Sequence, residues 1–247
     1  MGRRRPAWRT RSLGELTARF DLRAEEVVVA GRAWCLWRPA NPEALLDERA
    51  FARDEAKLPY WAELWPAARA LAAWLAEDPV AAPRALELGC GLGLPSLVWA
   101  ARTGGWVMAA DHAVPALALL RHHAAAHGLR TVRPVCRDWR EALSRWRRMG
   151  RFPFLFGSDL WYDRSTADRL PALLGVVAAP GALARFADPG RAPYTLFAAR
   201  LAATGWRRLR TVTVPVPGYA GRVQLEEWRA PERPRRGTLP RTPRPDP

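Results

Sequence analysis

Lysine and cysteine are both scarce in this chain of 247 residues. Lysine occurs once, at Lys57, among 39 basic residues, so almost every positive charge is an arginine. The three cysteines, Cys35, Cys90 and Cys136, are odd in number and far apart in the sequence. This spacing predicts neither a disulfide framework nor a zinc site, and we expect no bound metal.

Long apolar runs are also absent, because Arg, Pro or Gly interrupts each of them before it reaches the length of a membrane span. The chain begins with the basic residues Met-Gly-Arg-Arg-Arg-Pro, but no apolar core of a signal peptide follows them. These observations predict a cytoplasmic protein that has no membrane partner.

The net charge of +15 at first suggests a nucleic-acid partner. Residues 1–12 contribute +5 and residues 229–247 contribute +4, so nine of the fifteen charges lie in two ends rich in Arg and Pro. Such ends cannot bury enough apolar surface to fold, and we expect 1–12 and 230–247 to be disordered. The bias toward Arg, with so much Ala and Pro, indicates nucleotide-composition pressure more than phosphate recognition. We therefore do not expect a nucleic-acid partner.

The stretch from Arg84 to Asp111 organises the rest of the chain. Its hydrophobic pattern predicts a strand, a loop containing Gly89, Cys90 and Gly91, a helix, and a second strand that ends at Asp111. Glycines let the backbone approach a ligand closely, and the N-terminus of the helix is partially positive. An acid at the tip of the second strand can accept both ribose hydroxyls. The pattern therefore predicts a βαβ unit that binds a nucleoside.

Two nucleosides fit this description, a dinucleotide and S-adenosylmethionine. The spacing is G-x-G-x-G and not the G-x-G-x-x-G of dinucleotide binders. Glu87, two residues before the first glycine, would repel a pyrophosphate and attract a sulfonium or an α-ammonium group. The sequence therefore favours S-adenosylmethionine as the cofactor.

The run Glu-Leu-Gly-Cys-Gly-Leu-Gly resembles motif I of the class I methyltransferases. The resemblance implies an α/β fold, with a Rossmann-like sheet of seven strands and helices on both faces. The hydrophobic pattern predicts strands at 131–136, 152–157 and 182–187 after the βαβ unit. It also predicts a last antiparallel pair at 206–214 and 222–228.

The segment before motif I, Pro-Tyr-Trp-Ala-Glu-Leu-Trp-Pro, narrows the resemblance. It is similar to the lysine methyltransferases that modify the β-subunit of electron transfer flavoprotein, and to their seven-strand relatives. The resemblance implies that Trp65 contacts the cofactor; packing of the next helix against the sheet is the alternative. We assign 58–229 to the methyltransferase domain. Residues 13–57, with a hairpin about Ala30-Gly31, form an extension that serves as a lid or side wall.

The junction after the third strand carries Asp138 and Trp139. In class I methyltransferases this junction receives the adenine. The resemblance implies that Trp139 contacts the cofactor and that Asp138 can accept a hydrogen bond from the exocyclic amine. The alternative for Trp139 is packing in the first turn of a short helix.

The fourth strand ends in Ser158-Asp-Leu-Trp-Tyr, at the edge where ligands of open α/β sheets bind. Asp-x-x-Tyr resembles the signature of seven-strand protein-lysine methyltransferases, and it lacks the Pro-Pro of enzymes that act on adenine or amides. The resemblance implies that Ser158 contacts the cofactor and Asp159 orients or deprotonates the amine. It also implies that Trp161 and Tyr162 line a channel for the lysine methylenes. The alternative roles are a helix cap for Asp159 and plain packing for Tyr162.

We therefore expect a protein-lysine N-methyltransferase, with the electron transfer flavoprotein β-subunit as one candidate substrate. An N-methyltransferase of small heteroaromatic amines is the nearest alternative, because its pocket would use the same aromatic residues. An RNA or DNA methyltransferase and a binding protein without catalytic activity are the others. We expect the protein to be a monomer.

Overall fold

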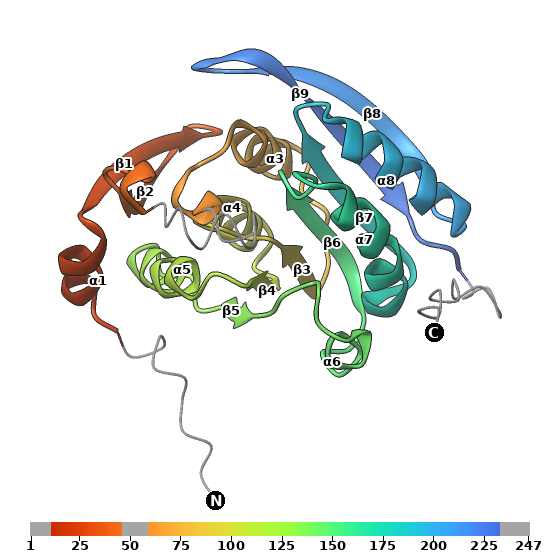
Figure 1. The fold of residues 1–247 in the computed structure, drawn as a ribbon, viewed down its shortest axis with the longest axis horizontal. Helices are drawn as coiled ribbons and strands as arrows, with labels where there is room; N and C mark the ends of the chain where they lie inside the picture. Colours follow the sequence, from red (N-terminus) through yellow and green to blue (C-terminus); the bar gives the residue numbers. More distant parts are fainter. Residues whose placement is uncertain (1–10, 46–58, 233–247) are drawn as a thin grey trace, which may run out of the picture.

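A computed structural model describes residues 11–45 and 59–232 of the chain. Its centre is a seven-stranded sheet in the order β5-β4-β3-β6-β7-β9-β8, with helices on both faces (Figure 1). The first five strands in this order run parallel, and β9 is antiparallel to both of its neighbours. The predicted α/β fold is confirmed, including the antiparallel pair that ends the sheet.

All the predicted strands of the sheet are present. They are β3 (Arg84–Leu88), β4 (Trp106–Asp111), β5 (Val132–Cys136), β6 (Phe152–Ser158), β7 (Ala178–Asp188), β8 (Arg207–Val216) and β9 (Tyr219–Arg229). The largest difference from the prediction is in β7, which begins four residues earlier than the pattern indicated. The order in which the strands are added to the sheet reverses between β3 and β6, so the carboxyl ends of these two strands border the usual ligand crevice.

The helices form one layer on each face of the sheet (Figure 1). The first layer holds α3 (Pro66–Glu77), α4 (Leu94–Thr103) and α5 (Val114–Ala126). The second holds α6 (Leu143–Arg147), α7 (Arg164–Val177) and α8 (Ala192–Ala203). Each layer buries its own apolar cluster against the sheet. In the described part of the chain, no helix is long and apolar enough to cross a membrane.

An N-terminal unit packs beside the first helix layer. It consists of α1 (Leu13–Phe20) and the antiparallel strands β1 (Leu22–Val29) and β2 (Arg32–Pro39). Ala30 and Gly31 form the turn with φ of 49° and 77°, the positive values that a two-residue type I′ turn needs. The predicted hairpin is therefore present.

Two short 3₁₀ helices, η2 (Glu43–Leu45) and η4 (Tyr60–Ala62), flank the part of the extension that is not described. The N-terminal unit contacts α5 through α1 and β2, and it contacts α3 through β1. The predictions for residues 1–10, 46–58 and 233–247, including most of both expected disordered ends, lie outside the described residues.

Candidate active site

A cavity opens at the carboxyl ends of the central strands, where the strand order reverses. Its empty volume, which includes space open to solvent, is about 820 Å³. The polar and aromatic residues that line it are Tyr60, Trp61, Glu63, Trp65, Asp111, His112, Trp139, Ser158, Asp159, Tyr162 and Arg191. The glycine loop and the start of α4, residues 89–95, complete the wall.

The glycine loop takes the close backbone path that its sequence predicts. Gly89 and Gly93 have positive φ of 60° and 82°. A Cβ at Gly89 would lie 2.5 Å from Leu160 Cδ2, and one at Gly93 would lie 2.3 Å from Leu120 Cδ1. Only glycine satisfies both requirements at these positions. The loop thereby brings Cys90 and Gly91 to the cavity, as expected for cofactor-binding residues.

Asp111 lies at the carboxyl end of β4 and fixes the loop from one side. Its Oδ2 accepts a hydrogen bond from Gly91 N at 2.8 Å, and its Oδ1 accepts one from Ala113 N at 2.8 Å. Burial raises the pKa of this carboxyl, while the nearby His112 opposes the rise. A carboxylate oxygen can accept more than one hydrogen bond, so these bonds leave acceptor capacity for a ligand. Asp111 therefore lines the cavity at the end of β4, and its role as a ribose ligand stays a prediction.

Glu87 requires a correction. The sequence suggested that its charge attracts a cationic ligand, but the side chain is 1% exposed and is not among the residues that line the cavity. It accepts a hydrogen bond from Ser96 Oγ, and burial raises its pKa to about 8. A carboxyl with this pKa is mostly protonated at neutral pH. Its place is behind the loop, where it joins β3 to α4.

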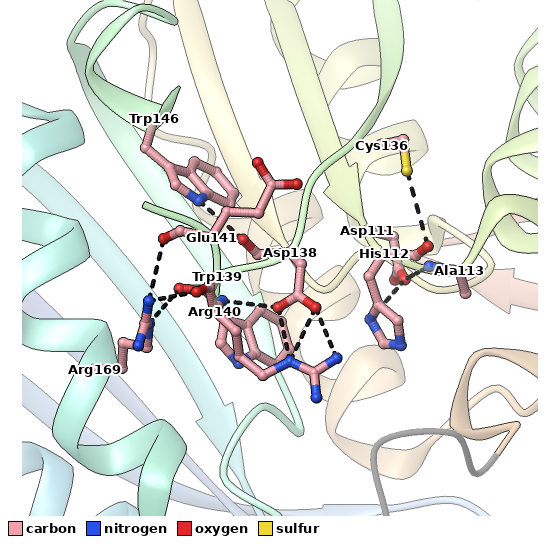
Figure 2. Close-up of polar contacts among 10 residues, drawn as sticks. All are labelled: Asp111, His112, Ala113, Cys136, Asp138, Trp139, Arg140, Glu141, Trp146 and Arg169. Atoms are coloured by element: carbon pink, nitrogen blue, oxygen red, sulfur yellow. Dashed lines mark hydrogen bonds and ion pairs between the residues drawn. The ribbon is translucent and has the colours of Figure 1, made fainter. Parts of the chain in front are cut away.

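The sequence predicts two cofactor contacts at the junction after β5, and the structure places these two residues differently (Figure 2). Trp139 lines the cavity, and its indole meets the His112 ring edge-on with centroids 6.4 Å apart. Asp138 does not line the cavity, because its carboxylate pairs with Arg140 at 2.7 Å. Although partial burial favours a higher value, the hydrogen bonds from Arg140 lower the pKa of Asp138. The carboxylate already accepts hydrogen bonds from Arg140 N, Nε and Nη2, which leaves fewer acceptor positions for an adenine.

The same junction is held in shape by two side chains from the helices around it (Figure 2). Arg169 Nε donates to the carbonyl of Trp139 at 2.8 Å, and Trp146 Nε1 donates to the carbonyl of Asp138 at 3.1 Å. Arg169 also donates to the carbonyl of Glu141 at 3.2 Å. These bonds to backbone oxygens fix the position from which Trp139 faces the cavity.

An aromatic wall closes the cavity on the side of α3. Trp65 lines it, and its Nε1 donates to the carbonyl of Tyr60 at 2.8 Å. The Tyr60 ring lies 5.2 Å from the Tyr162 ring, which in turn lies 6.2 Å from Trp139. Burial raises the pKa of Tyr162 above its ordinary value, so its hydroxyl stays protonated. The wall brings Trp65 and Tyr162 to the site, as predicted.

Asp159 follows β6 and adopts an unusual backbone conformation, with φ of 55°. Its Oδ1 pairs with Arg191 Nη1 at 2.6 Å, whereas its Oδ2 is buried without a hydrogen-bond partner among the described residues. The side chain is 9% exposed and lines the cavity beside Ser158. Burial raises the pKa of Asp159, while Arg191 and the nearby backbone N–H of Ala67 oppose the rise.

The helix after Asp159 is capped by a different residue. Asp163 is the N-cap of α7 and accepts a hydrogen bond from Thr166 N at 2.8 Å. The alternative interpretation of Asp159 as a helix cap is therefore wrong. Its left-handed backbone is also an outlier of the kind that is costly, and such outliers cluster at functional sites.

Trp161 requires a second correction, because it does not reach the cavity. The indole is fully buried in the second helix layer, 4.6 Å from Tyr194 and 4.6 Å from Phe197 between ring centroids. Its Nε1 has no hydrogen-bond partner in the described part of the chain. Trp161 therefore packs beneath the Asp159 turn and does not line a substrate channel.

Arg191 is a cavity residue that the sequence interpretation missed. Its Nη1 donates to Asp159 and also to Asp188 Oδ2 at 3.1 Å. Asp188 ends β7 and is fully buried, which raises its pKa to about 6 although Arg191 opposes the rise. In the sequence, the run Asp188-Pro-Gly-Arg191 predicts a turn after the fifth strand and resembles a segment of the flavoprotein methyltransferases, but it gives no role to Arg191. A signal was available, since β6 and β7 are neighbours and both segments follow carboxyl ends at the same edge.

The histidines of α5 do not form a metal site. Within residues 11–45 and 59–232, no group of three or more His, Cys, Asp or Glu side chains could hold a metal ion. His123 is buried against backbone groups, and His122 contacts the carbonyl of Arg11 at 2.9 Å.

Comparison of the sequence with protein-family profiles and with curated proteins found no match. Many solved structures resemble the fold. The N-methyltransferase NodS from Bradyrhizobium japonicum WM9, solved with S-adenosyl-L-homocysteine, has a TM-score of 0.52 and 17% identity, covering 77% of this chain and 98% of NodS. TYW2 from P. horikoshii, solved with MeSAdo, has a TM-score of 0.57 and 16% identity, covering 85% of this chain and 72% of TYW2.

A protein from Streptococcus mutans, assigned as a SAM-dependent methyltransferase, has a TM-score of 0.62 and 11% identity. The match covers 84% of this chain but only 55% of the S. mutans protein. At such low sequence identities the comparisons support a conclusion about the fold alone. The chain therefore has the seven-strand, Rossmann-like fold of S-adenosylmethionine-dependent methyltransferases.

Proposed function

We propose that the protein is an S-adenosylmethionine-dependent N-methyltransferase, and that its acceptor is a lysine side chain of a protein substrate. The observation that carries the proposal is Asp159, a residue of the cavity wall whose buried Oδ2 has no hydrogen-bond partner among the described residues. An unpaired buried acceptor is costly, and a donor on a ligand would remove that cost. The N–H group of an amine is such a donor.

The residues around the cavity fit S-adenosylmethionine. A Cβ at Gly91 would meet nothing closer than Trp61 O at 3.8 Å, so a side chain there would fill space that a ligand can use. Asp111 would accept the ribose hydroxyls, and Trp139 would pack against the adenine. The loop backbone would hold the methionine part. When bound, S-adenosylmethionine supplies an electrophilic methyl group on a sulfonium.

The chain's own residues can prepare an amine for this transfer. Free lysine has a pKa of about 10.4, so the nitrogen must lose a proton and present its lone pair in line. Asp159 Oδ2 would accept an N–H and orient the nitrogen, while Arg191 holds the other carboxylate oxygen in place. The rings of Tyr60 and Tyr162 would pack along the methylenes and favour the positive charge that forms on the nitrogen during methyl transfer.

The test compares Asp159→Asn with Asp163→Asn. Asparagine tolerates positive φ, so the first change removes the charge while the backbone conformation of Asp159 is retained. We expect methyl transfer to fall on the order of 10²-fold, as for a positioned proton acceptor, with unchanged affinity for S-adenosylhomocysteine. Asp163→Asn keeps a capping oxygen for Thr166 N and removes a nearby charge that does not line the cavity, so we expect full activity per folded molecule.

Lysate incubated with methyl-labelled S-adenosylmethionine identifies the acceptor. Label on a protein lysine, lost with Asp159→Asn, supports the proposal. Label on small amines alone would assign the heteroaromatic-amine alternative, and label on RNA or DNA would assign a nucleic-acid substrate. Equal activity of the two asparagine variants per folded molecule would refute the role of Asp159.

A further inference from the structure

His123 lies between the glycine loop and the N-terminal hairpin. The side chain is fully buried in α5, with Nδ1 at 3.0 Å from the carbonyl oxygen of Leu92 and Nε2 at 2.8 Å from Trp37 N. The Leu92 carbonyl can only accept, so Nδ1 carries the proton; the Trp37 N–H can only donate, so Nε2 accepts. Nε2 also lies 3.2 Å from the Trp37 carbonyl oxygen. A neutral imidazole with its proton on Nδ1 satisfies Leu92 O and Trp37 N at once, and we assign this tautomer. Burial agrees with this state, because it lowers the pKa of His123 to about 4.

One of these two partners belongs to the wall of the cavity. Leu92 lies in the glycine loop, where Gly93 N donates to the carbonyl of Cys90 at 2.7 Å. Asp111 holds the same loop from the opposite side through Gly91 N. The loop is thus tied at two points, by Asp111 at its ligand-facing edge and by His123 at the Leu92 carbonyl.

The other partner belongs to a unit that touches the cavity wall in two further places. Phe20, which ends α1, meets Trp61 edge-on with ring centroids 5.5 Å apart. Arg38 in β2 pairs with Glu63 at 3.3 Å. Both Trp61 and Glu63 line the cavity. The N-terminal unit, residues 13–39, therefore supports the cavity from the segment before α3 as well as from the loop.

We propose that His123 is a positioning residue that couples the N-terminal hairpin to the glycine loop and thereby sets the affinity for the cofactor. The inference rests on the proposed function, since it takes S-adenosylmethionine as the ligand of the loop. The hairpin then acts as a fixed side wall of the cofactor site, and its contact with the loop passes through one imidazole.

Two amide variants separate the two bonds of the imidazole. In His123→Asn the amide nitrogen takes the place of Nδ1, which keeps the bond to Leu92 and loses the bond to Trp37. In His123→Gln the amide oxygen takes the place of Nε2, which keeps the bond from Trp37 and loses the bond to Leu92. Each variant leaves one buried backbone group unpaired, so both lose stability and serve as controls for each other.

Calorimetry with S-adenosylhomocysteine measures cofactor affinity in the full chain. We expect His123→Gln to raise Kd about 10-fold or more and His123→Asn to raise it less than about 3-fold, because only the first variant releases the loop. Amide hydrogen exchange of residues 90–93 gives a second readout that needs no ligand. We expect faster exchange there in His123→Gln than in His123→Asn.

Equal Kd values and equal exchange rates in the two variants would overturn the inference and leave His123 a core residue. If the wild-type chain failed to bind S-adenosylhomocysteine, the proposed function would fall. Amide hydrogen exchange of residues 90–93 would then test only the coupling between the loop and the hairpin. A difference in exchange rate between the two variants would support this coupling, and equal rates would refute it.

Discussion

Replacing Glu87 by glutamine tests whether this buried carboxyl is neutral in the folded protein. Burial raises its pKa from 4.5 to about 8, so the folded protein keeps a proton that the unfolded chain has released. For a group whose pKa is raised on folding, the stabilising contribution is fully present below the unfolded pKa. It is lost as the pH rises through the folded pKa, here across the window from 4.5 to about 8.

The expected magnitude follows from the shift. One pKa unit corresponds to about 1.4 kcal/mol, so the free energy of unfolding falls by on the order of 5 kcal/mol over the whole window. Glutamine keeps the shape and an oxygen for Ser96 Oγ, but it does not titrate. Relative to the Glu87→Gln variant, the wild type therefore loses about 2–3 kcal/mol over two pH units inside the window.

The assay is urea denaturation of both proteins at a series of pH values, with Ser96→Ala as the control. That control removes the hydrogen bond and leaves the carboxyl in place, so its pH profile keeps the wild-type slope. Affinity for S-adenosylhomocysteine stays unchanged in Glu87→Gln, since the side chain does not line the cavity. Parallel profiles of wild type and Glu87→Gln would refute the reasoning. Glu87 would then be ionised, as the attraction of a sulfonium requires.

Three further predictions concern the cavity and α5. Asp111→Ala lowers the affinity for S-adenosylhomocysteine by about 1–3 kcal/mol in calorimetry, because charge-assisted ribose bonds are lost. Since burial lowers the pKa of His123 from 6.5 to about 4, its contribution is present above 6.5 and lost as the pH falls toward 4. Urea denaturation in the Glu87→Gln background measures this loss, on the order of 3 kcal/mol. Tyr162→Phe keeps the ring, so methyl-transfer rates fall less than with Asp159→Asn.

The helices and strands of this fold could be predicted because the spacing of apolar residues along the sequence reflects which side chains are buried. The parallel strands are short and covered on both faces, so they stand out as apolar runs between glycines. The loop at Gly89 and the acid at Asp111 could be placed together as well, since neighbouring parallel strands end at one edge. Residues at that edge lie close together, and this does not depend on the conformation of the loops between the strands.

The direction of single side chains was harder to predict. Glu87 lies on β3 between Leu86 and Leu88, which pack in the second helix layer, so alternation turns it toward α4 and Ser96. The sequence already showed this alternation, but the position of Glu87 next to the glycine motif led to the prediction that it faces the ligand. Trp161 lies two residues after Asp159, whose φ is positive, and such a turn has no periodicity from which the direction of a side chain could be predicted.

Arg191 illustrates a different limit. Its partner Asp159 is 32 residues away, and the ion pair exists because β6 and β7 are neighbours in the sheet. Local spacing carries no information on such a pair. Only the full strand order, combined with the two segments that follow these strands, brings the guanidinium to the carboxylate.

The position of β9 inside the sheet sets the order in which the chain can complete its fold. β9 lies between β7 and β8, although it is the last strand of the sheet in the sequence. Until residue 229 has emerged from the ribosome, β7 remains an open sheet edge whose partner does not yet exist. Open edges that carry apolar residues such as Phe186 invite pairing with other chains. Nascent chains of this protein therefore depend on the late arrival of β9 to close the edge.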